Sequence, residues 1–116
     1  MTLDFFIHLF VATAFAMAPH QQGDILMSSA PAIMVKIAQC ESRAQQFTSE
    51  GKVVYNPKSG DFGVFQINKM HLKTAQNMGL DVMTLEGNIR YALHLYSKNG
   101  TRDWNSSKAC WAPEGT

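Results

Sequence analysis

Residues 32–43 read Ala-Ile-Met-Val-Lys-Ile-Ala-Gln-Cys-Glu-Ser-Arg, a stretch that predicts a helix with a carboxyl group in its last turn. Its apolar side chains recur at intervals of three and four residues, at Ile33, Ile37 and Cys40, which is typical of a helix with one buried face. Residues 28–31 offer serine caps and a first-turn proline for its start. Glu41 lies one turn beyond Ile37, so we expect its carboxyl at the margin of the core.

A small hairpin is expected downstream of this helix. Residues 45–60 lose the helical period and carry turn residues, while the apolar run 52–55 favours a short strand or hairpin arm. Residues 64–67 form a second short apolar stretch. The tail from Thr101 predicts a short helical turn that is tied back to the first helix.

Two further helices complete the expected fold. One covers about residues 69–78 and ends where Gly79 takes the C′ position. The other is capped by Asp81 or Thr84 and carries apolar residues on one face until Asn99-Gly100 ends it. Because helices outnumber strands, we expect an α+β class that is mostly α.

Length and charge limit the classes of protein that are possible. The chain has 116 residues, of which 46% are hydrophobic, enough for one small core and no second domain. Ten Lys and Arg residues stand against nine Asp and Glu, which gives a formal net charge of +1. The charges are spread along the sequence without a basic block, so we expect no nucleic-acid partner.

The first eighteen residues differ in composition from the rest. Residues 5–16 form a short apolar run, and residues 14–16 and 16–18 fit the small-x-small pattern of signal-peptide cleavage. The run is too short to span a bilayer comfortably, although Asp4 and the lack of a basic residue depart from the usual signal. We expect residues 1–18 to be a signal peptide, which leaves residues 19–116 as an exported, periplasmic or extracellular domain with no stable membrane span. The alternative is an N-terminal helix that stays attached and packs or anchors.

Two cysteines, Cys40 and Cys110, stand near the two ends of the domain. An even count behind a signal peptide favours a disulfide, which would close a loop of about 70 residues and stabilise the fold by roughly 4 kcal/mol. Two buried free thiols are the alternative. The sequence has no metal-binding motif, so we expect neither a metal nor another cofactor.

The chemistry expected of Glu41 is that of a protonated acid. Apolar surroundings and the negative end of the helix dipole both raise the pKa of a carboxyl group in this position. Downstream, residues 61–68 read Asp-Phe-Gly-Val-Phe-Gln-Ile-Asn and combine a glycine with amides that can bond sugar hydroxyl and N-acetyl groups. Glycoside cleavage needs such an acid beside such a groove. Taken separately, the two features also fit a solvated carboxylate and a polar turn.

Residues 37–42, 61–68 and 88–96 together resemble the lysozyme-like superfamily, in its soluble lytic transglycosylase and goose-type branch. The pattern is similar to that of the small transglycosylases of conjugation and type IV secretion machines. It covers roughly Ala32 to Trp111, and the order and spacing of its three motifs make it fairly specific. The resemblance implies a lysozyme-like fold with a small β-hairpin.

The resemblance also implies an activity. Glu41 would be the single acid/base that cleaves the bond between N-acetylmuramic acid and N-acetylglucosamine in peptidoglycan and leaves a 1,6-anhydro ring. It implies no cofactor, peptidoglycan glycan strands as the substrate, and envelope secretion or conjugation machinery as a possible partner. The residues that it places at the substrate are Ser42, Asp61, Phe65, Gln66, Asn68 and Tyr91.

Two departures from the family pattern leave alternatives open. The Ala-Tyr-Asn-Ala-Gly segment of the family is replaced by residues 104–111, in which Trp104 and Trp111 favour core packing over sugar stacking. Asp61 either caps its turn or orients a water, which would make the protein a hydrolysing lysozyme that uses Glu41 and Asp61. A non-catalytic glycan-binding or scaffold protein on the same frame is a further alternative.

The two histidines of the domain core carry no expected role. His71 and His94 are separated by a helix break and have no acidic or cysteine partner at metal-ligand spacing. We therefore expect both at the surface or the edge of the core rather than in catalysis.

Overall fold

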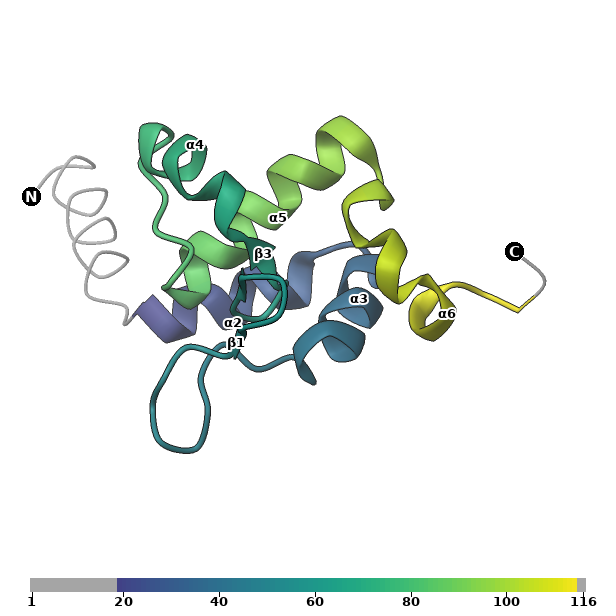
Figure 1. The fold of residues 1–116 in the computed structure, drawn as a ribbon, viewed down its shortest axis with the longest axis horizontal. Coiled ribbons are helices and arrows are strands. Elements are labelled where there is room, and N and C mark those ends of the chain that lie inside the picture. The colour runs from purple at the N-terminus through teal and green to yellow at the C-terminus, as the bar shows by residue number, and fades with distance from the viewer. Residues whose placement is uncertain (1–18, 115–116) are drawn as a thin grey trace, which may run out of the picture.

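The computed structural model describes residues 19–114, in which helices surround a small antiparallel sheet (Figure 1). The α+β class with mostly helical content is confirmed. The expected signal peptide at residues 1–18 lies outside the described residues. Within residues 19–114, every helix is too short or too polar to cross a membrane.

The predicted first helix is confirmed as α3 (Ala32–Ser42). Its buried face consists of Met34, Ile37 and Ala38, all 0% exposed, whereas Ile33 and Cys40 of the predicted apolar period are partly buried at the edge of this face. The helix ends because Arg43 and Ala44 both take left-handed backbone conformations, each with φ of 58°. This early stop leaves Glu41 in the last turn.

Helix α2 (Pro19–Ser29) was not expected and corrects the predicted start of α3. The hydroxyls of Ser28 and Ser29 donate to the Ile25 carbonyl, at 2.8 and 3.0 Å, and so end α2 rather than cap α3. Pro31 takes the N-cap position of α3 without a side-chain cap.

Helix α2 runs beside α5 (Leu85–Asn99), the longest helix of the described chain (Figure 1). Its Gly23 is buried against Leu85, where a Cβ atom would come within 2.4 Å of the leucine Cγ. A side chain at this position would push the two helices apart, so glycine permits their close approach.

The sheet contains three short strands in the order β1-β2-β3: β1 (Tyr55–Asn56), β2 (Asp61–Phe62) and β3 (Ile67–Asn68). Asp61 pairs with Asn68, and Phe62 pairs with Ile67. The strand or hairpin arm predicted at 52–55 overlaps β1 only at Tyr55, because Val53 instead forms an isolated bridge with Phe47. Strand β3 at the end of the second apolar stretch adds an arm to the expected hairpin.

The helices on either side of Gly79 agree with the sequence pattern. A 3-10 turn, η1 (Lys69–His71), leads into α4 (Leu72–Asn77), and Gly79 then takes a φ of 76°. The Leu80 amide donates to the Ala75 carbonyl at 2.9 Å, which closes the predicted C-terminal motif. Thr84 is the cap of α5, because its hydroxyl accepts from the Gly87 amide at 3.0 Å.

The tail returns to α3 as a 3-10 helix, η2 (Arg102–Ser107), followed by α6 (Lys108–Trp111). Cys40 and Cys110 form a disulfide with a Cα–Cα distance of 6.0 Å, as predicted. Trp104 and Trp111 are only 3% and 6% exposed, which confirms that both pack in the core.

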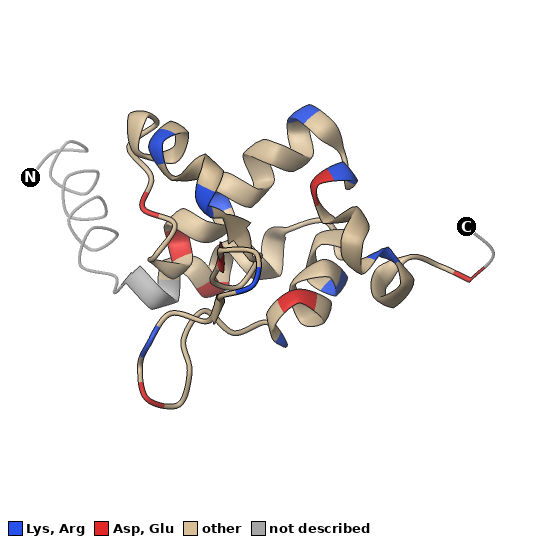
Figure 2. Cartoon of the chain, in the orientation of Figure 1, with Lys and Arg blue, Asp and Glu red and all other residues tan. Residues whose placement is uncertain are grey.

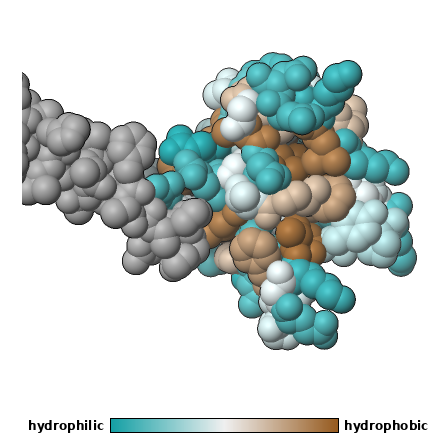
Figure 3. Space-filling view, turned by 90° about the vertical axis from the view of Figure 1, so that its left-hand side faces the viewer, coloured by the Kyte–Doolittle hydropathy of each residue, from teal (hydrophilic) through white to brown (hydrophobic). Residues whose placement is uncertain are grey.

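Charged residues are spread along the described chain, whereas apolar side chains gather on one side of its surface. Lys and Arg are interspersed with Asp and Glu along the described chain (Figure 2). Apolar side chains reach the surface on the side where α4 lies (Figure 3). A pocket of about 370 Å³ near α4 is lined by Leu72, Gln76, Leu80, Asp81 and Val82. Its single carboxyl, Asp81, accepts from the Met83 amide at 2.9 Å.

Candidate active site

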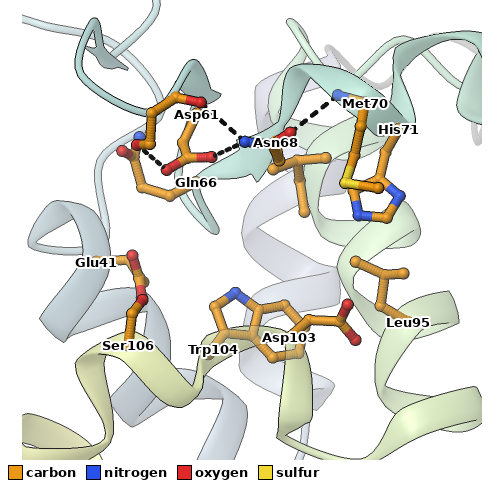
Figure 4. A pocket seen from close by; sticks show the side chains of 12 residues that line it. Glu41, Asp61, Gln66, Asn68, Met70, His71, Leu95, Asp103, Trp104 and Ser106 are labelled. Carbon is orange, nitrogen blue, oxygen red and sulfur yellow. Dashed lines mark hydrogen bonds between the residues drawn. The ribbon is translucent and has the colours of Figure 1, made fainter.

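A second pocket, of about 230 Å³, contains the predicted acid (Figure 4). Its wall is built from the end of α3, the sheet, η1, α5 and η2. Glu41 and Ser106 lie on one side, and Asp61 and Gln66 lie across the opening from them (Figure 4). The carboxyl group of Glu41 in the last turn of α3 thus faces, across the pocket, the amide-bearing hairpin that the sequence pattern indicated.

Glu41 is half-buried, and burial raises the pKa of its carboxyl above the usual range. The Ser107 hydroxyl donates to Glu41 Oε2 at 2.5 Å, which stabilises the anion and opposes this increase in pKa. The negative charge of Asp61 acts in the same direction as burial. The balance favours a carboxyl group that holds a proton to higher pH than a solvated glutamate does.

The carboxylate of Asp61 is held inside the hairpin. Asn68 Nδ2 donates to its Oδ1 at 2.8 Å, and the Ser59 hydroxyl donates to its Oδ2 at 2.5 Å. Asn68 also accepts from the Met70 amide at 3.0 Å, so it ties the hairpin to η1. Both Asp61 and Asn68 line the pocket, and their mutual bond fixes the β2-β3 edge of the wall.

Gln66 lines the pocket from a left-handed backbone conformation, with φ of 51°. A residue other than glycine adopts this conformation only where its surroundings hold it there. Gln66 Nε2 donates to the Gly63 carbonyl at 3.0 Å, and the Gln66 amide donates to the same carbonyl at 3.1 Å. The turn before β3 therefore presents the glutamine at a fixed place in the wall.

Two buried amide side chains hold this turn, and the sequence pattern did not reveal their role. Gln46 is 4% exposed, and its Oε1 accepts from the Val64 amide at 2.8 Å. Asn88 of α5 is 0% exposed, and its Oδ1 accepts from the Phe65 amide at 2.9 Å. Both side chains also donate to the Val82 carbonyl. For Asn88, the available signal in the sequence was a polar residue on the apolar face of the last long helix.

Gly63 is the residue that lets these amides approach the turn. Its φ is 78°, and a Cβ atom would lie 2.3 Å from Asn88 Nδ2 and 2.4 Å from Gln46 Oε1. No side chain fits between them. Gly63 therefore supports the turn, because its lack of a side chain leaves room for the two amides.

Three predicted substrate residues lie behind the pocket wall. Ser42 donates from its hydroxyl to the Val64 carbonyl at 2.7 Å and so joins the end of α3 to the turn. The Phe65 side chain is 0% exposed and packs near Trp104, whose Nε1 donates to the Phe65 carbonyl at 2.9 Å. Tyr91 is 2% exposed. These residues support the wall, whereas Glu41, Asp61, Gln66 and Asn68 line it.

His71 was expected at the surface or the edge of the core, and the structure places it in the pocket wall (Figure 4). Its Nδ1 lies 3.0 Å from the Tyr91 hydroxyl. Burial raises the pKa of Tyr91, and the charge of Asp103 adds to the effect, so the phenol stays neutral. The ring of His94 also packs near Tyr91, with a distance of 5.6 Å between the two ring centroids.

Ser107 is a further residue whose role the sequence pattern did not reveal. It follows Trp104-Asn105-Ser106 in the segment that departs from the family pattern, and it has no motif of its own. Its contact with Glu41 spans 66 residues of sequence. Only the folded chain brings the two together.

Searches against protein-family models, curated proteins and solved structures found no match. Within the described residues, no group of three or more His, Cys, Asp or Glu side chains is arranged to hold a metal ion. The chemistry that the arrangement supports is proton transfer by a half-buried carboxyl beside hydrogen-bonding amides.

Proposed function

We propose that the protein is a peptidoglycan lytic transglycosylase with a lysozyme-like fold, in which Glu41 is the general acid and then the general base. One observation carries the proposal. The carboxyl of Glu41 is half-buried in the wall of a pocket, its pKa is raised, and it faces the amide-bearing hairpin that contains Gln66 and Asn68. A proton donor and a polar groove for a sugar are the two parts that glycoside cleavage requires.

The proposed reaction uses the carboxyl group of Glu41 twice, first as a proton donor and then as a proton acceptor. Protonated Glu41 gives its proton to the oxygen between N-acetylmuramic acid and N-acetylglucosamine as the bond from that oxygen to C1 breaks. The N-acetyl group of the substrate supports the positive charge on the sugar. The C6 hydroxyl then bonds to C1, its proton returns to Glu41, and a 1,6-anhydro ring closes. No nucleophile from the protein takes part.

The position of Asp61 supports transglycosylation over hydrolysis. A hydrolase that inverts needs a second carboxylate to activate a water on the far face of the sugar. Both carboxylate oxygens of Asp61 already accept hydrogen bonds from Asn68 and Ser59 within the hairpin. This favours a structural role for Asp61, together with its effect on the pKa of Glu41.

The proposed setting is the cell envelope. The disulfide between Cys40 and Cys110 is compatible with export to a periplasmic or extracellular compartment. There the proposed substrate is the glycan strand of peptidoglycan, and the proposed partner is an envelope secretion or conjugation machine that needs a local opening in the wall.

Product analysis tests the proposed function. Purified sacculi are digested with the wild type and with Asp61→Asn, and the soluble products are identified by mass spectrometry. We expect anhydromuramyl ends from both proteins. Free reducing ends from the wild type, lost in Asp61→Asn, would instead indicate a hydrolysing lysozyme. Binding to sacculi without soluble products would indicate a glycan-binding scaffold.

A further inference from the structure

The hydroxyl of Ser107 lies between three polar groups. It is 2.5 Å from Glu41 Oε2 and 3.1 Å from the Trp104 carbonyl oxygen, and both of these can accept its hydrogen. Trp111 Nε1 donates to Ser107 Oγ at 3.1 Å. A serine hydroxyl carries one hydrogen, so at any moment it can donate a full hydrogen bond either to the Glu41 carboxyl or to the Trp104 carbonyl.

We propose that Ser107 is a positioning residue for Glu41 whose hydroxyl hydrogen follows the charge of the carboxyl group. When Glu41 is ionised, Ser107 donates to Oε2. When Glu41 is protonated, the hydrogen of Ser107 turns to the Trp104 carbonyl. This inference rests on the proposed function only for its effect on the reaction, because the exchange of partners is a property of the free protein.

The contact with Trp111 limits how strongly Ser107 can hold the proton of the protonated acid. A carboxylic acid beside a free serine oxygen would donate its proton to that oxygen. Here the Trp111 indole already donates to Ser107 Oγ, which occupies one acceptor position of the hydroxyl. The acid proton of Glu41 is therefore less engaged by the protein and can be donated into the pocket.

The exchange also stabilises the state that follows proton donation. As Glu41 gives up its proton, the serine hydrogen returns to the new carboxylate and forms a charge-assisted hydrogen bond. Such a bond is stronger than the one to the neutral carbonyl. Ser107 thus favours the anion just when the anion is formed, which promotes the acid step.

Buried tryptophans and a disulfide hold Ser107 in place beside Glu41. Trp104 and Trp111 are buried, and Trp111 Nε1 also lies 3.2 Å from the Trp104 carbonyl. The disulfide connects Cys40, the residue before Glu41, with Cys110, which lies on α6 three residues after Ser107. The serine and the carboxyl are therefore held together by a covalent link near each partner.

The charged surroundings of Glu41 do not replace Ser107 in this role. Asp61 of β2, His71 of η1 and Asp103 of η2 line the same pocket. The basic side chains of the helices packed at this corner are exposed to solvent, namely Lys36, Arg102 and Lys108, and so is Arg43 directly after α3. Among the described residues, the hydrogen bond that Glu41 accepts from a side chain comes from Ser107.

The test is a titration of the Glu41 carboxyl by ¹³C NMR. The chain has four glutamates, so Glu41→Gln identifies the signal. In Ser107→Ala we expect the pKa of Glu41 to rise, because the anion loses its donor. Trp111 keeps a partner in this variant, the Trp104 carbonyl, so the fold should persist. Ser107→Thr, which keeps a hydroxyl, should titrate like the wild type, as should Asn105→Ala, an exposed change in the same segment.

A second readout uses the wild type alone and does not depend on the folding of a variant. The indole N–H of Trp111 donates to Ser107 Oγ, so its resonance should shift with pH at the same midpoint as the Glu41 carboxyl. An indole resonance that stays constant while Glu41 titrates would overturn the proposal. So would an unchanged pKa of Glu41 in a folded Ser107→Ala protein.

The activity readout separates this inference from the proposed function. On sacculi, Ser107→Ala should lower the rate of product release by about tenfold or more, and the alkaline limb of its pH profile should move to higher pH. Ser107→Thr should restore the rate and the pH profile of the wild type. If the NMR shifts appear but the wild type releases no anhydromuramyl products, the proposed function fails and the role of Ser107 stands. If the wild type is active and Ser107→Ala matches it in rate and pH profile, the inference fails alone.

Discussion

Removal of the disulfide is the perturbation with the largest expected effect on stability. The bond joins residues separated by 70 positions, and it ties α6 to the turn of α3 that carries Glu41. In the chain-entropy model, a loop of this length contributes about 4.4 kcal/mol at 25 °C. A small domain has about 5–15 kcal/mol of stability in total, so this one bond accounts for a large share.

The same figure sets the expected change in melting temperature. Unfolding entropy near 60 °C is about 2.1 cal/mol/K per residue, or about 0.2 kcal/mol/K for a domain of this size. A loss of about 4.4 kcal/mol therefore lowers Tm by about 20 °C. Cys110 is exposed, so a reductant in solution has access to its side of the bond.

The assay compares three samples by circular dichroism on heating: the oxidised wild type, the wild type with a phosphine reductant, and the Cys40→Ala/Cys110→Ala double variant. The reduced wild type and the double variant should melt at similar temperatures, well below the oxidised protein. The reductant should leave the Tm of the double variant unchanged, which makes that variant the control. A fall in Tm of less than about 5 °C would refute the entropic account of this bond.

Three other perturbations test the site. Gly63→Ala forces a Cβ atom against Asn88 and Gln46 at a left-handed backbone position. We therefore expect the free energy of unfolding in urea to fall by about 3 kcal/mol or more. A loss below about 1 kcal/mol would show that the turn relaxes. Asn88→Ala leaves the Phe65 amide buried without its acceptor and should cost about 3 kcal/mol, against almost nothing for the exposed Asn105→Ala. The folded state raises the pKa of Glu41. The wild type should therefore lose stability relative to Glu41→Gln as the pH rises from the ordinary glutamate range through the raised pKa. A difference in unfolding free energy between the two proteins that does not vary with pH would contradict this.

The sequence was sufficient for the elements whose pattern is local. The spacing of Ile33, Ile37 and Cys40 predicted α3, and it placed Glu41 at the margin of the core in the last turn. The glycine at position 79 predicted the end of one neighbouring helix, and Asp81 or Thr84 predicted the start of the other, where Thr84 is the cap. Each of these signals depends on residues within a turn or two of one another.

The parts that escaped prediction depend on distant contacts. Helix α2 contains few apolar residues and an internal glycine, and its place is set by packing on α5, where Gly23 meets Leu85. Gln46 could not be recognised as a support for the turn, because its partners Val64 and Val82 lie 18 and 36 residues away. The entry of His71 into the pocket likewise follows from the fold and not from a motif.

The substitution Glu41→Gln tests the central claim most directly. Glutamine keeps the size of the side chain and can accept from Ser107, but it has no acidic proton to give. Wild type and variant are incubated with purified sacculi, and both the bound protein and the soluble anhydromuramyl products are measured over time. We expect equal binding and equal folding, with product formed by the wild type alone. Equal product release by the variant would contradict the assignment of Glu41 as the acid.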